Sequence, residues 1–161
     1  MPGLEARMIT GRLLTILDEA LHGASGPVTY FVDNRPDSGL LGALAGLDAA
    51  GASRAVGGSS IAAHVHHVTF AMEASAAWIM GDRTPRDWKA SWQVAMVDDE
   101  AWPLLLERLC HQYRNLRAAI EEAAGTGEDA FGEAVGAIAH IACHLGSVRQ
   151  KLAVLREASR T

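Results

Sequence analysis

The segment Asp129–Ala158 constrains the fold of this chain more than any other, because its apolar residues recur in steps of three and four. This spacing places side chains on one face of an α-helix. The apolar positions are Phe131, Val135, Ile138, Ile141, Leu145, Val148, Leu152 and Leu155. We therefore expect one long helix whose apolar face packs against other helices, as in a helical bundle.

Three earlier segments show helical spacing of apolar residues as well. They are Leu4–His22, Ser60–Met80 and Glu100–Ala124. Ser59 or Ser60 can cap the second of these, and Gly81 can end it. Asp98 or Asp99 can cap the third. The sequence thus predicts four long helices with separate start and stop signals.

The connection between the first two long helices is less regular. Val28–Val32 looks like a β-strand, but a lone strand without a partner is not stable, so we expect an ordered connection there. Leu40–Ala50 is rich in Ala, Leu and Gly and predicts one short helix. The expected fold is all-α: a four-helix bundle in a single domain over residues 1–161, with a short extra helix in the first connection.

Composition and charge exclude several classes of function. The chain has 161 residues, a net charge of -5 and only 14 Lys and Arg residues, which are scattered, so we expect no nucleic-acid partner. The sequence has no long uncharged apolar segment, so we expect no membrane span. The N-terminal residues lack the order of a signal peptide, and Cys110 and Cys143 match no metal or redox motif. We therefore expect a cytoplasmic protein with two free thiols.

Histidines form two groups on the predicted helices. His140 and His144 lie four residues apart, so their rings project to one side of the last helix. His64, His66 and His67 cluster on the second long helix. One imidazole from this cluster would complete a site with three protein ligands and an open position, which is the arrangement of catalytic metal sites. The residues alone leave the third ligand open, because His64 and His67 share a face and His66 points away by about 100°.

Two further features have alternative interpretations. Trp88 and Trp92, with Asp87, lie in the loop after the second long helix. They can form the wall of a pocket, pack in a dimer interface, or cover the end of the bundle. Glu133 lies on the same helical stripe as His140 and can orient a ligating imidazole, but the sequence favours an ordinary solvated charge.

Several segments resemble the DinB/YfiT-like proteins. Ser59–Val68 resembles the histidine motif of their second helix, and Ala139–Gln150 resembles the histidine pair of their final helix. Trp78–Asp82 and Asp87–Trp92 are similar to a subgroup with W-x-x-G and D-W-x-x-S-W motifs. The likeness covers about residues 4 to 155. It implies an up-down-down-up bundle with a long crossover, which is commonly a homodimer.

The resemblance also implies a site and a chemistry. It assigns His67, His140 and His144 as ligands of a divalent metal ion, zinc or nickel before iron, with His64 as the main competitor of His67. Some members transfer or isomerise small thiols such as mycothiol, bacillithiol or glutathione. We therefore expect a metal-dependent enzyme acting on a small thiol or another small molecule, with S-transfer first and metal-assisted hydrolysis second. The alternatives are a non-catalytic metal-binding or stress-related helical interaction protein, and histidines that bind nothing.

Overall fold

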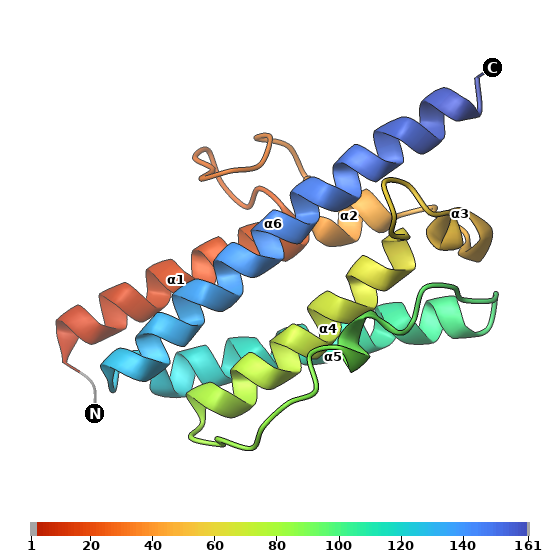
Figure 1. Cartoon of the computed structure of the whole chain (residues 1–161). Coiled ribbons are helices and arrows are strands. Elements are labelled where there is room, and N and C mark those ends of the chain that lie inside the picture. The colour runs from red at the N-terminus through yellow and green to blue at the C-terminus, as the bar shows by residue number, and fades with distance from the viewer. Residues whose placement is uncertain (1–2, 161) are drawn as a thin grey trace.

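The computed structural model describes residues 3–160, and the elements in this range are helical (Figure 1). No β-strand occurs among these residues, which contain only two isolated bridges. The prediction of an all-α helical bundle is confirmed. The elements are α1 (Leu4–His22), α2 (Leu40–Leu44), α3 (Ala49–Ser53), α4 (Ile61–Ile79), the 3-10 helix η1 (Ala90–Trp92), α5 (Ala101–Ala123) and α6 (Glu128–Ala158).

The long helices pack mainly around α4 and α6. Helix α4 contacts both α5 and α6, and α1 contacts α5 and α6 from the other side. The segment between α4 and α5 returns along α4 and carries η1 against it (Figure 1). This packing places one face of α4 beside α6 and covers both with the return segment.

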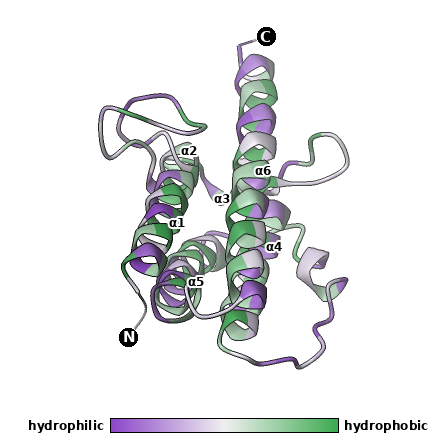
Figure 2. Cartoon of the chain, turned by 90° about the vertical axis from the view of Figure 1, so that its left-hand side faces the viewer, coloured by the Kyte–Doolittle hydropathy of each residue, from purple (hydrophilic) through white to green (hydrophobic). Residues whose placement is uncertain are grey.

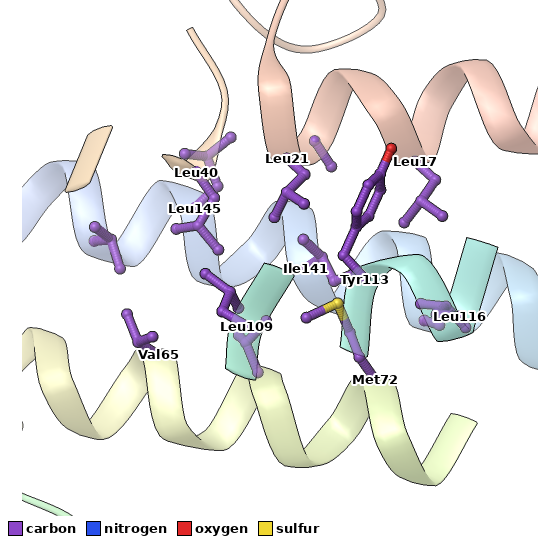
Figure 3. Close-up of a cluster of buried hydrophobic side chains, with 14 of the residues drawn as sticks. Leu17, Leu21, Leu40, Val65, Met72, Leu109, Tyr113, Leu116, Ile141 and Leu145 are labelled. Carbon is purple, nitrogen blue, oxygen red and sulfur yellow. The ribbon is translucent and has the colours of Figure 1, made fainter. Parts of the chain in front are cut away.

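The core is formed by side chains from α1, α2, α4, α5 and α6 (Figure 3). The predicted apolar face of α6 contributes from Ile138 to Leu155, where all of its members are buried. Its first two members, Phe131 and Val135, are instead 40% and 43% exposed. The small residues Ala134 and Ala137 are buried in this part of α6. The expectation for the first turns is therefore wrong, because small side chains make the contact there.

The hydrogen bonds show which of the predicted capping residues caps each helix. Ser60, not Ser59, caps α4: its Oγ accepts from the N–H of Ala63 at 3.0 Å. The same hydroxyl donates to the carbonyl of Ala95 at 2.5 Å and so ties the return segment to the start of α4. Asp98 accepts from the N–H of Ala101 at 2.7 Å at the start of α5. Gly81 follows α4 with a φ of 94°, a conformation that favours glycine.

The first connection contains two short helices, α2 and α3, where the sequence predicted one over Leu40–Ala50. The break occurs around Gly46, whose φ of 75° is incompatible with a continuing helix. Asp48 then starts α3 by accepting from the N–H of Gly51 at 2.7 Å. A left-handed glycine followed by an N-cap residue is thus the physical reason for the correction.

The β-like run Val28–Val32 is held by a carboxylate, not by another strand. Glu19 of α1 is buried, and its oxygens accept from the backbone N–H groups of Tyr30, Phe31 and Val32 at 2.8 to 3.2 Å. These bonds satisfy both the buried carboxylate and the backbone donors of the loop. The expectation of an ordered connection without a strand is confirmed.

Two features bear on where the protein works. Helix α6 is long and apolar enough, by length and composition alone, to cross a membrane, a test that core helices of soluble proteins also pass. Apolar and polar segments alternate along it (Figure 2), and its buried apolar residues belong to the bundle core. Cys110 and Cys143 are free thiols, as expected.

Candidate metal centre

Three histidines from two helices meet where α4 packs on α6. Nε2 of His140 lies 3.1 Å from Nε2 of His67 and 2.9 Å from Nε2 of His144. One nitrogen of each ring lies within 4.8 Å of the others. His67 and His144 are buried and His140 is half-buried. The structure therefore brings together His67, His140 and His144, which can hold a metal ion.

Two of the three separations between these nitrogens, both from His140, fit a common first-row metal ion. Imidazole nitrogens bind zinc at about 2.0–2.1 Å, which places ligands at angles of about 90–110° about 2.9–3.4 Å apart. The two measured separations of 2.9 and 3.1 Å fall in this range. The donor set of three nitrogens suits zinc, nickel and iron.

A buried serine fixes the orientation of the His67 ring. The Oγ of Ser91 donates its only hydrogen to the carbonyl of Trp88 at 2.6 Å. It lies 2.7 Å from Nδ1 of His67, so Nδ1 must carry the hydrogen of that second bond. Ser91 has no exposed surface, so water does not compete for these bonds. Nε2 of His67 is therefore unprotonated in the neutral ring and points its lone pair at His140.

Without a cation, both contacts of His140 with the other two rings depend on a single hydrogen. Since Nε2 of His67 has no hydrogen, its contact with His140 needs a hydrogen on Nε2 of His140. The contact between His140 and His144 would then have to use the same hydrogen. A cation between the rings instead uses one lone pair from each of the three nitrogens. This requirement is the main chemical argument for a metal site here.

Burial also keeps the rings in the form that binds metals. Loss of solvent, and then repulsion from neighbouring imidazoles, lowers the pKa of His67 to about 4 and that of His144 to about 3. Burial lowers the pKa of His140 as well. All three rings are therefore neutral at pH 7, and a metal ion would not have to displace protons from them.

The other histidines of α4 have different contacts. Nδ1 of His66 donates to the carbonyl of Ser91 at 2.7 Å and so anchors the return segment. Nδ1 of His64 lies 2.8 Å from Nδ1 of His144, on the edge of that ring opposite the three Nε2 atoms. Of the three clustered histidines, both His64 and His67 thus contact the pair on α6, but only His67 places a nitrogen in the cluster of three that can hold a metal ion.

Two tryptophans lie over the histidines from the return segment. Trp92 of η1 stacks on His67, with ring centroids 4.1 Å apart and an angle of 20°, and meets His64 edge-on. Trp88 packs its ring against Phe70. Trp92 remains 41% exposed, so it separates the histidines from solvent on one side only in part. This arrangement agrees with a pocket wall better than with a cap on the end of the bundle.

Glu133 does not orient a histidine. Its carboxylate accepts from the hydroxyl of Ser75 at 2.6 Å. It also lines a cavity of about 340 Å³, shared with Trp88 and with two arginines, Arg83 and Arg86. None of the three histidines lines this cavity, but Trp88, which does, has its ring centroid 6.2 Å from that of His67. The sequence preference against an orienting group agrees with these contacts, whereas the expected solvated charge is instead half-buried and bound to Ser75.

Sequence reasoning did not identify Ser91 or Ser59 as partners of the histidines. Ser91 stands within the D-W-x-x-S-W segment, and its position between two tryptophans was the only signal for it. For Ser59, the sequence predicts only a role as a helix cap. Both contacts depend on how the return segment and the turn before α4 fold back, which apolar spacing does not encode.

Comparisons with known proteins add no family assignment. No protein-family model, curated protein or solved structure matches this chain. The resemblance to the DinB/YfiT-like proteins stays a prediction, and the argument for the site rests on its geometry.

Proposed function

We propose that this protein binds one divalent metal ion through His67, His140 and His144. The observation that carries the proposal is the convergence of three Nε2 atoms, whose two close contacts would otherwise have to share one hydrogen. The hydrogen bond from His67 to Ser91 adds support, because metal-binding histidines usually donate their second ring N–H to a fixed acceptor. A donor set of imidazoles suits zinc, nickel and iron, and the resemblance to the DinB/YfiT-like proteins places zinc and nickel first.

We further propose that the centre is catalytic, with a small thiol as the first substrate class. Three protein ligands leave a position for water or substrate, and a bound metal ion with such a position can stabilise a thiolate or lower the pKa of water. The family resemblance favours thiol S-transfer, and metal-assisted hydrolysis is the second reaction. The cavity beside Trp88 offers aromatic and guanidinium groups to the body of a substrate. The half-buried His140 and the partial cover by Trp92 are compatible with access from one side.

A non-catalytic metal-binding role is the second candidate. The stacking of Trp92 on His67 and the burial of His67 and His144 also suit a centre that only stabilises the bundle. Such a centre would raise the melting temperature on metal binding but would not accept an added ligand.

The same resemblance leads us to propose an up-down-down-up helix order and a homodimer. The return of the segment between α4 and α5 along α4 supports this helix order (Figure 1). Sedimentation velocity at several concentrations would test the dimer.

Cobalt substitution separates the catalytic from the non-catalytic role. Purified protein would be loaded with one equivalent of Co²⁺, which reports its ligands through visible absorption, and titrated with glutathione. An accessible position predicts a new thiolate-to-cobalt band, absent in His140→Ala at equal protein concentration. A cobalt spectrum that is unchanged by thiol and by other small anions would contradict the catalytic proposal while leaving metal binding intact.

A further inference from the structure

His64 is buried beside the three histidines but does not share their Nε2 cluster. Its relative exposed surface is 8%, equal to that of His144. Its Nδ1 lies 2.8 Å from Nδ1 of His144, and its Nε2 lies 3.0 Å from the hydroxyl of Ser59. Both ring nitrogens of His64 therefore have a fixed partner away from the proposed metal position.

The direction of these hydrogen bonds follows from the chemistry of His144. If Nε2 of His144 binds a metal ion, the hydrogen of its neutral ring must be on Nδ1. Nδ1 of His64 must then accept this hydrogen, so the hydrogen of His64 is on Nε2. Nε2 of His64 in turn donates to Ser59. The three residues form a chain of hydrogen bonds that all run away from the metal position.

The far end of this chain is fixed by a buried lysine. The ammonium group of Lys151 on α6 donates to the backbone carbonyls of Val56 and Ser59, the latter at 3.0 Å. These bonds tie the turn before α4 to α6, the helix that carries His144. Trp92 lies edge-on against the ring of His64, with centroids 5.3 Å apart. The ring of His64 is thus held by Ser59 and Trp92, and the backbone of Ser59 is held in turn by Lys151.

We propose that His64 is a positioning residue, which accepts the Nδ1 hydrogen of His144 and so orients that ring for metal binding. This inference rests on the proposed metal centre. It gives His64 the same role toward His144 that Ser91 has toward His67, which is to accept the Nδ1 hydrogen of a ligating ring. Partners of this kind fix the tautomer of a ligand and make it a stronger base, and their loss typically lowers metal affinity about 10- to 100-fold. An imidazole in this role is neutral, whereas a carboxylate would add a charge to the site.

The test compares two substitutions of the same residue. His64→Ala removes the acceptor, whereas His64→Asn keeps an oxygen at the same number of bonds from the backbone as Nδ1. Zinc affinity would be measured by competition with a chromogenic chelator, with His111→Ala on the exposed side of α5 as a control. We expect affinity about 10- to 100-fold lower for His64→Ala, largely restored in His64→Asn, and unchanged in the control. The zinc-loaded wild type should also show a hydrogen-bonded Nδ1–H resonance of His144 that His64→Ala lacks.

Each other outcome contradicts the inference in a recognisable way. Equal loss of affinity in His64→Ala and His64→Asn would mean that His64 is itself a ligand. Wild-type affinity in His64→Ala would mean that His144 needs no acceptor. Either result overturns the role of His64 while the metal centre stands. A wild-type protein that binds no zinc, nickel or iron would overturn the metal centre and this inference together.

Discussion

Acid should destabilise the metal-free protein through the buried histidines. The ordinary pKa of a histidine is 6.5, and burial lowers the pKa of His67 to about 4 and of His144 to about 3 in the folded protein. Below pH 6.5 the unfolded chain therefore binds more protons than the folded chain, and stability falls as the pH falls. The contribution is fully present above pH 6.5 and is lost progressively between pH 6.5 and the folded pKa values.

The size of the effect follows from these pKa values. At pH 5.0, proton binding to the unfolded chain costs the folded state about 2 kcal/mol for each of the two rings, relative to pH 7.5. Part of each shift is repulsion among the same rings, so the two costs overlap. We therefore expect a loss of about 2 to 4 kcal/mol in the free energy of unfolding between pH 7.5 and pH 5.0 from these two residues.

Urea unfolding of chelator-treated protein, followed by circular dichroism at both pH values, measures this loss. The double variant His67→Asn/His144→Asn lacks the two titrating rings, whereas the variant His111→Asn changes an exposed histidine and serves as the control. The pH-dependent loss should be smaller in the double variant by about 2 to 4 kcal/mol and unchanged in the control. If the double variant does not fold, each single variant should show about half of this difference in the pH-dependent loss. An equal pH dependence in all proteins would refute the reasoning.

Four other substitutions test the contacts described above. Ser91→Ala removes the acceptor for His67 and should weaken zinc binding about tenfold in chelator competition; an unchanged affinity would mean that His67 needs no fixed partner. Glu19→Ala leaves three loop N–H groups without their acceptor and should lower the free energy of unfolding, measured in urea, by about 2 to 4 kcal/mol. A loss of less than about 1 kcal/mol would mean that the loop does not depend on Glu19. On α6, a Cβ at Gly136 meets open space, so Gly136→Ala should stabilise the protein by about 0.5 to 1 kcal/mol. On α2, a Cβ at Gly42 would lie 1.9 Å from a carbonyl oxygen, so Gly42→Ala should destabilise the protein strongly in the same assay. Equal effects of the two substitutions would contradict the packing around α2.

The long helices were predictable because their signals are local. Apolar spacing marks the buried face of α6 from Ile138 onward, and capping residues and glycines mark helix ends within one residue of those found. The first turns of α6 were not predicted correctly, because alanine packs there and spacing arguments follow large side chains. The split between α2 and α3 was also missed, since it depends on the positive φ of Gly46.

The candidate site was predictable only in part. The pair His140 and His144 follows from helix geometry alone, because four residues span about one turn. Spacing could not separate His64 from His67, which share a face of α4. That choice depends on how α4 and α6 are rotated toward each other, and the resemblance to a family supplied it. The contact between His67 and Ser91 depends on a loop of irregular structure, and its only local signal is the position of Ser91 between two tryptophans.

The central claim is that three histidines of this chain bind one metal ion. Elemental analysis of protein purified without a histidine tag, for the wild type and for His144→Ala, tests it most directly. The account predicts about one equivalent of zinc, nickel or iron per chain in the wild type, and its loss in the variant, with the helical content of the two proteins equal by circular dichroism. Absence of metal from the wild type, even after incubation with each of these ions, or equal metal content in both proteins, would contradict it.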